Sequence, residues 1–192
     1  MNKIGLLAVI VLFFSSNVFA QWTLSPDEST LKFISIKKNT IAEVSQFKEF
    51  EGSIDKTGKV EISVDLSSVD SNIGIRDQRL KSILFNVAKY SHATLKGMVD
   101  VTRASKMKAG EFFTELATLN LSLHGVDKDV IAEVTVVKLN DERWLISSAK
   151  PVIINAADFG MVEGINSLRE LAGLSSIATA IPVTFEFIFN AG

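Results

Sequence analysis

The chain has 192 residues, of which 47% are hydrophobic and 22% are charged, a composition typical of a globular protein and not of a disordered one. Lysine and arginine total 20 against 22 acidic residues, so the net charge of −2 gives no electrostatic footprint for nucleic acid. The absence of cysteine excludes disulfides, zinc fingers, iron–sulfur clusters and cysteine nucleophiles.

The first twenty residues are typical of a secretory signal peptide. Lys3 is their only charged residue, and residues 4–14 form an apolar run that polar residues then end. This run is short for a membrane anchor, which needs about 20 apolar residues. Small residues precede Gln21, as they do at a signal-peptidase site. We therefore expect residues 1–20 to be cleaved as a signal peptide, residues 21–192 to form one domain, and the protein to be secreted into the periplasm.

Alternation of apolar and polar residues predicts that most of the mature chain forms β-strands. The alternating segments run, in chain order, over residues 31–36, 44–54, 60–66, 93–102, 117–124, 130–139, 144–149, 152–155 and 183–189. Turn-forming residues such as Asp55 to Gly58 separate several of them. One apolar face per strand and short connections indicate an antiparallel sheet. The prediction is an all-β fold in which about eight strands close into a barrel, because closure removes exposed sheet edges.

Two segments interrupt the strand pattern. Residues 71–90 contain Leu80, Ile83 and Leu84 at helical spacing, and residues 162–179 contain a short amphipathic pattern. Neither segment fits in a closed sheet. We predict one or two short helices that cap a barrel mouth, with packing against the outside of the barrel as the alternative.

The apolar surplus in these segments and in the strands indicates a cavity, since loops that face water have no reason to be apolar. A cavity of this kind would bind a hydrocarbon ligand, because each buried CH₂ contributes about 0.8 kcal/mol. From the alternation we expect the following residues to line it: Phe33, Leu66, Ile75, Leu80, Leu84, Leu95, Leu119, Leu121, Phe159, Leu168, Leu171 and Phe185. A slip of one residue in strand register would invert this assignment.

Residues suited to catalysis or metal binding are sparse. His92 and His124 are the only histidines, and neither belongs to a metal-ligand pattern, so we predict no metal site. Arg76, Asp77 and Arg79 form the one dense charged cluster outside a turn, and an ion pair that holds the loop is the favoured interpretation. The enzyme alternative is a hydrolase or isomerase that uses Arg76, Asp77 and His124, which requires the three side chains to converge around a cleft.

Six short motifs, in the same order, resemble those of the YceI-like family. They begin with the opening strand, Trp22 to Phe33, and continue with FKEFEG at 47–52, the Arg76 to Leu80 stretch, FNVAKY at 85–90, LSLHGV at 121–126 and DFGM at 158–161. The resemblance covers nearly all of the mature chain, from Trp22 to Phe189. Arg79 stands where the family usually has histidine, and Ser91 stands where it has proline.

The resemblance implies a lipocalin-like, eight-stranded antiparallel β-barrel without catalytic residues, metal or other cofactor. It also implies a periplasmic protein that sequesters or carries a long isoprenoid, such as a quinone tail or polyprenyl lipid, inside the barrel. Transient contact with a membrane and a homodimer are further expectations. The remaining alternative is a structural protein whose barrel is filled by its own side chains.

Overall fold

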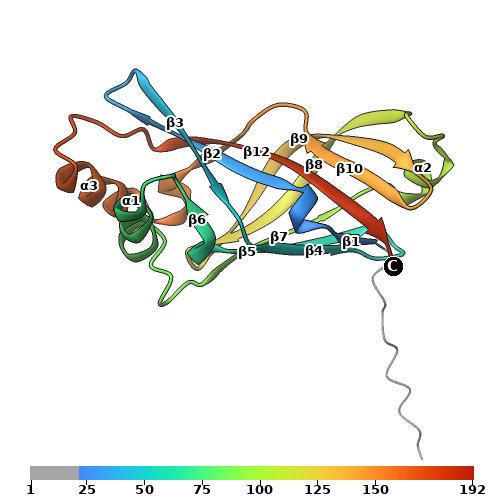
Figure 1. Ribbon diagram of the computed structural model, residues 1–192, viewed down its shortest axis with the longest axis horizontal. Helices are drawn as coiled ribbons and strands as arrows, with labels where there is room; N and C mark the ends of the chain where they lie inside the picture. Colours follow the sequence, from blue (N-terminus) through green and yellow to red (C-terminus); the bar gives the residue numbers. More distant parts are fainter. Residues whose placement is uncertain (1–21) are drawn as a thin grey trace, which may run out of the picture.

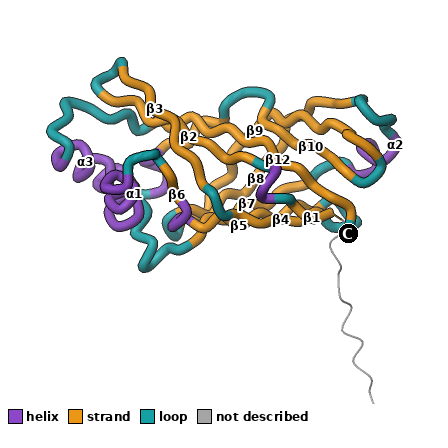
Figure 2. Tube along the Cα trace, in the orientation of Figure 1, coloured by secondary structure: helices purple, strands orange, loops and turns teal. Residues whose placement is uncertain are grey.

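The computed structural model describes residues 22–192, so the predicted signal peptide lies outside the described residues. Most of the described chain is strand (Figures 1 and 2). The strands are β1 (Trp22–Leu24), β2 (Thr30–Lys37), β3 (Ile41–Phe47), β4 (Phe50–Ile54), β5 (Lys59–Asp65), β6 (Val69–Asp70), β7 (His92–Met98), β8 (Phe112–Leu123), β9 (Val126–Asn140), β10 (Arg143–Ser148), β11 (Val152–Asn155) and β12 (Ala180–Ala191). The helices are α1 (Gly74–Arg79), α2 (Val101–Lys106) and α3 (Val162–Leu171), with short helical turns η1 (Pro26–Glu28), η2 (Leu66–Ser68), η3 (Leu80–Leu84) and η4 (Ala156–Phe159).

The strands close into an antiparallel barrel of eight, which confirms the predicted fold class. The ring runs β1-β4-β5-β7-β8-β9-β10-β12, and pairing of β12 with β1 closes it. The additional strands β2, β3, β6 and β11 continue or precede members of this ring across a bend. For example, η1 separates β1 from β2, and η2 separates β5 from β6.

Strand β12 changes partners along its length and so divides the barrel into two halves. Its last residues pair with β1 on one side and with β10 on the other, through Phe189 opposite both Leu24 and Trp144. Its first residues pair instead with β2 and β11, through Val183 opposite Phe33 and Val152. The half near the chain's C-terminus is therefore the closed ring, and the half formed with β2, β3 and β6 extends toward α1 and α3 (Figure 1).

Large aromatic side chains fill the half of the barrel near the C-terminus. The rings of Trp22 and Trp144 stack with centroids 3.9 Å apart, and Phe189 is buried beside them. Helix α2 covers this end and buries Ala104 completely. The prediction that a strand continues to residue 102 is wrong, because α2 begins at Val101. The Asp100 side chain accepts a hydrogen bond from Arg103 N at 2.8 Å and so caps the helix.

Helices α1 and α3 lie together at the opposite end of the barrel, with η3 and η4 (Figure 2). Close approach of α3 to η3 depends on Gly164, where an added Cβ would lie 3.0 Å from the Ile83 carbonyl oxygen. A second apolar cluster, which includes Leu66, Leu80 and Ile165, joins these helices to the barrel. The two predicted helical segments are thus present, each shorter than its predicted range, and both pack at one mouth of the barrel.

The stacked tryptophans lead to a stability prediction. Trp144 is 1% exposed, and its replacement by alanine leaves a cavity in the filled half, so Trp144→Ala should lower the free energy of unfolding by about 3–5 kcal/mol. Phe112→Ala is the matched control, because Phe112 is 67% exposed and should change stability by less than about 0.5 kcal/mol. Urea unfolding of both variants measures the difference, and equal effects would contradict the assigned packing.

Candidate functional site

A cavity of about 480 Å³ lies in the half of the barrel that faces α1 and α3. Its wall comes from the inward faces of the strands and from residues of α1, η3 and α3, and most of the residues that line it are apolar. The cavity reaches the surface beside α1, since Ile73 and Ile75 line it and are still 48% and 57% exposed. The site is therefore an oily interior with an opening at the helical end.

The structure brings most of the predicted lining residues together. Ten of the twelve line this cavity: Phe33, Leu66, Ile75, Leu80, Leu84, Leu95, Leu119, Leu121, Leu168 and Phe185. The strand members lie on one face because residues two apart in a strand point the same way, as Leu119 and Leu121 do in β8. Their contact with a ligand stays a prediction.

Two of the predicted residues do not line the cavity. Phe159 is 1% exposed and packs in the apolar cluster behind the wall, where η4 turns at Gly160 with a φ of +66°. Leu171 is 55% exposed at the end of α3, although Leu168 of the same helix and its C-cap Ala172 line the cavity. Helical geometry explains this, because at about 100° per residue Ile165, Leu168 and Ala172 share one face, whereas Leu171 lies about 60° beyond the edge of that face.

Sequence reasoning missed much of the wall formed by β2, β3 and β11. Phe47 and Ser45 of β3 line the cavity opposite Leu31 and Phe33, with which they pair. Ile154 of β11 also lines it. Ser45 and Phe47 do alternate with Val44 and Gln46 in the sequence. The strand is interrupted between residues 47 and 50, however, so the period of two across β3 and β4 is weak.

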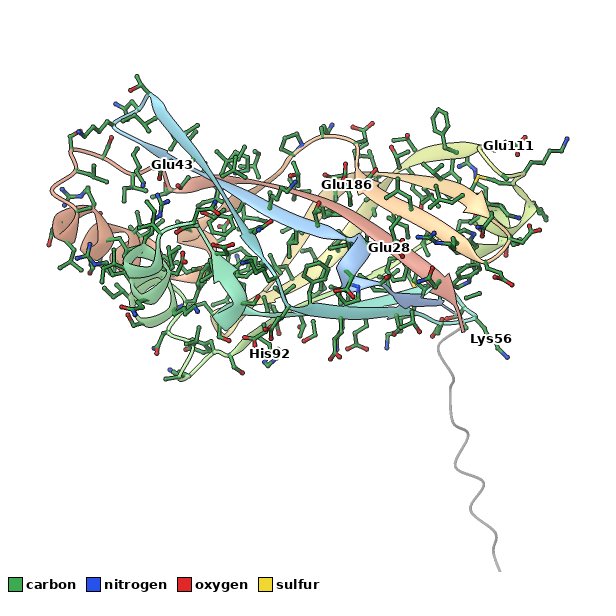
Figure 3. All side chains as sticks on the ribbon, viewed as in Figure 1. Glu28, Glu43, Lys56, His92, Glu111 and Glu186 are labelled. Atoms are coloured by element: carbon green, nitrogen blue, oxygen red, sulfur yellow. The ribbon has the colours of Figure 1, made fainter. Side chains whose placement is uncertain are left out.

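A charged cluster lies at the helical end of the cavity. The Glu43 carboxylate accepts hydrogen bonds from Lys37 of the paired strand and from Arg76 of α1, and all three residues line the cavity. Figure 3 shows Glu43 on β3 at the helical end, far from Lys56 and Glu111 at the other end of the barrel. The cluster therefore links the β2–β3 hairpin to α1 beside the opening.

The two cations lower the pKa of the Glu43 carboxyl below its usual 4.5. The hydrogen bond from Lys37 is the largest cause, burial opposes it, and the positive charges of Lys37 and Arg76 add to the lowering. Glu43 is therefore ionised at neutral pH. It neutralises only one of the two cations that it contacts.

The residues of the enzyme alternative do not converge. Arg76 donates from Nε to Ser71 Oγ at 2.8 Å and from Nη2 to the Ser71 carbonyl at 2.7 Å. Asp77 accepts from Ser71 N at 2.8 Å. The Nδ1 atom of His124 instead lies 3.2 Å from the Phe159 carbonyl oxygen. The His124 ring packs on the Tyr90 ring, with centroids 4.5 Å apart. No hydrogen bond joins His124 to either residue within the described chain, so this geometry does not favour the catalytic alternative.

Two further features of residues 22–192 bear on the site. They contain no group of three or more histidine and acidic side chains placed to hold a metal ion. Among their helices, none has the length and apolar character needed to cross a bilayer.

Comparison with known proteins adds sequence relatives. Residues 22–189 match the YceI-like domain family. Protein YceI from Salmonella arizonae and from Salmonella newport are each 34% identical to the chain over 105 residues, which is 51% of this chain and 51% of theirs. The aligned region thus spans about half the length of these curated relatives.

Solved structures resemble the barrel along most of its length. A polyisoprenoid-binding domain from Saccharophagus degradans, implicated in plant cell wall breakdown, superimposes with a TM-score of 0.88 at 32% identity, over 90% of this chain and 99% of that domain. Burkholderia cenocepacia BcnA has a TM-score of 0.65 at 16% identity, over 86% of this chain and 98% of its own, and it supports the fold alone.

The ionised Glu43 leads to a pH prediction. Because the pKa of Glu43 is lower in the folded than in the unfolded chain, the Glu43 carboxylate stabilises the fold above pH 4.5. This stabilisation is lost as the pH falls from 4.5 through the lowered pKa. Glu43→Gln should reduce the free energy of unfolding by about 1 kcal/mol at pH 7, since the pair is partly solvated, and the difference from wild type should narrow below pH 4.5. Glu186→Gln, at an exposed position of β12, is the control. A Glu43→Gln effect that is the same at pH 7 and pH 3 would contradict the ion pairing.

Proposed function

The chain belongs to the YceI-like family, and we propose that it is a non-catalytic protein that binds a long isoprenoid or a similar amphiphilic lipid. The apolar cavity is the observation that carries this proposal. A hydrocarbon chain inside it would remove apolar surface from water on both sides, at about 0.8 kcal/mol for each buried CH₂. The cost of ordering a flexible chain offsets part of this gain. The polyisoprenoid-binding domain that shares the fold at 32% identity supports the same ligand class.

Apolar and charged residues lie at opposite ends of the cavity, and we propose that this arrangement orients the ligand. The filled half of the barrel blocks one end through Trp22, Trp144 and Phe189, whereas the charged residues lie at the helical end. A tail would therefore point toward the tryptophans, and the polar headgroup of a quinone or prenyl lipid would stay at the opening. The cavity does not favour the alternative of a structural protein, whose barrel would be filled by its own side chains.

We further propose that the protein works in the periplasm and exchanges its lipid during transient contact with a membrane. Four apolar residues at the helical end are 46–57% exposed: Ile41 of the β2–β3 hairpin, Ile73 and Ile75 at the start of α1, and Leu171 of α3. Ile73 and Ile75 are continuous with the cavity wall. An apolar rim around an opening lets a lipid pass from a bilayer into the barrel without crossing water. The homodimer stays a prediction.

The lipid proposal predicts that a charge inside the cavity prevents retention. Leu121→Asp places a carboxylate on the wall, where it would have to be desolvated against the lipid, and should reduce co-purifying lipid at least tenfold. Leu116→Asp is the matched control, because it lies on the same strand and is 70% exposed. Solvent extraction and mass spectrometry of both purified proteins measure the lipid, and thermal unfolding checks that both are folded. Equal lipid in a folded Leu121→Asp variant would contradict the proposal.

The membrane proposal predicts an effect on transfer rate. Leu171 does not line the cavity, so Leu171→Glu should leave the affinity for lipid unchanged and slow the transfer of a fluorescent prenyl lipid to vesicles several-fold. Ile131→Glu, on the outer wall of the barrel, is the control and should transfer at the wild-type rate. The idea fails if both variants transfer lipid equally fast.

A further inference from the structure

The inner end of the cavity lies at one level of strand β12. Inward-facing residues of this strand alternate with outward-facing ones, and Val183, Phe185 and Phe187 follow one another along the cavity wall. Phe189, the next inward residue, is 1% exposed and lies outside the wall, within the filled half. The ring of Phe187 therefore stands at the boundary between the cavity and the filled half.

The wall on strands β8 and β9 ends at a matching step. Leu119 of β8 and Val130 of β9 are paired, and both line the cavity. The next inward pair, Ala117 and Ala132, is buried and does not line it. Alanine side chains are too short to fill a barrel of eight strands, so the space beyond this step is filled by side chains from other strands.

Aromatic side chains from the opposite wall fill that space. In the ring of eight strands, β7, β8 and β9 lie across from β12, β1 and β4. At this level the first three strands contribute the small residues Gly97, Ala117 and Ala132, and the other three contribute Phe187, Trp22 and Phe50. Of these six residues, only Phe187 lines the cavity. Phe187 is therefore the face of the aromatic plug that a ligand in the cavity would meet.

Contacts on both sides hold the Phe187 ring in place. It stacks on the Phe185 ring, with centroids 4.9 Å apart and an interplanar angle of 17°, and it packs on the Phe50 ring with centroids 5.6 Å apart. Phe187 is 3% exposed, and Ile146 of the neighbouring strand pairs with it. A closely packed ring cannot swing aside for a ligand without disturbing its neighbours. The ring is thus suited to stop a hydrocarbon chain at a fixed depth.

We propose that Phe187 limits the length of the isoprenoid tail that the cavity accepts, because the end of the tail meets its ring. The inference rests on the proposed lipid function and adds selection by tail length to it. A phenyl ring has six carbons and an isoprene unit has five, so removal of the ring should admit about one further unit. That unit would lie against the small residues of β7, β8 and β9.

The test measures which tail length the protein selects. Delipidated protein is incubated with phosphatidylcholine vesicles that carry an equimolar series of prenyl alcohols, each one isoprene unit longer than the last. The protein is then separated from the vesicles, and solvent extraction with mass spectrometry gives the amount of each alcohol that it retains. The wild-type protein should retain one tail length most, because shorter tails bury fewer CH₂ groups and longer tails meet Phe187. Phe187→Ala should move this maximum to a tail one unit longer and raise retention of that alcohol, relative to the wild-type optimum, by about tenfold.

Two further variants separate tail length from stability. Phe189→Ala removes a ring from the same strand behind the boundary, so it should lose stability as Phe187→Ala does and keep the wild-type maximum. Val130→Phe adds a ring to the wall at the boundary, where it points into open space, and should move the maximum to a tail about one unit shorter. Thermal unfolding checks that each variant is folded. If Phe187→Ala does not fold, the shift in Val130→Phe decides the question.

The outcomes separate this inference from the proposed function. Retention of no prenyl alcohol by the wild-type protein would overturn lipid binding itself. Retention that rises with tail length across the whole series would overturn the limit and leave lipid binding intact. An unchanged maximum in folded Phe187→Ala or in Val130→Phe would also overturn the inference, as would a shift in Phe189→Ala equal to that in Phe187→Ala.

Discussion

The size of the side chains on the inward face decides what this barrel can do. An eight-stranded ring encloses space that side chains can just fill, or leave open for one small ligand. In the half near the C-terminus, Trp22, Trp144 and Phe189 reach the axis and pack against one another. In the other half, Ser45 and Ala93 stand at inward positions and are too short to do so. This contrast in side-chain size contributes to the cavity.

The two ends of the molecule therefore have different chemistry. The filled end supplies the buried apolar area that keeps the barrel closed, so the open end can keep unfilled space without losing the fold. Charge is concentrated where the space opens, on Lys37, Glu43, Arg76 and Arg79. An amphiphile matches this arrangement, because its tail requires a dry interior and its headgroup requires polar contacts at the surface.

Much of this arrangement could be predicted from the sequence, because a period of two in strands fixes which residues share a face. This period predicts that Leu119, Leu121 and Phe185 line the cavity, and they do. The helical segments were less predictable: Leu171 and Phe159 are apolar and close in sequence to wall residues, but the rotation of α3 and the turn of η4 direct them elsewhere. The closed ring also depends on the change of partners along β12, which no local pattern encodes.

The charged opening was the part that sequence reasoning interpreted least fully. Arg76, Asp77 and Arg79 stood out as a cluster, but the pairing of Arg76 with Glu43 joins residues 33 positions apart. That contact forms only when the β2–β3 hairpin is placed beside α1, so it is visible only in the folded chain.

The most direct test of the central claim is a crystal structure of the mature protein as purified from cells, without added ligand. The account predicts continuous, elongated electron density within the cavity, running from the opening beside α1 toward the stacked tryptophans. An interior in which side chains close over that volume, with no space for a hydrocarbon chain, would contradict it.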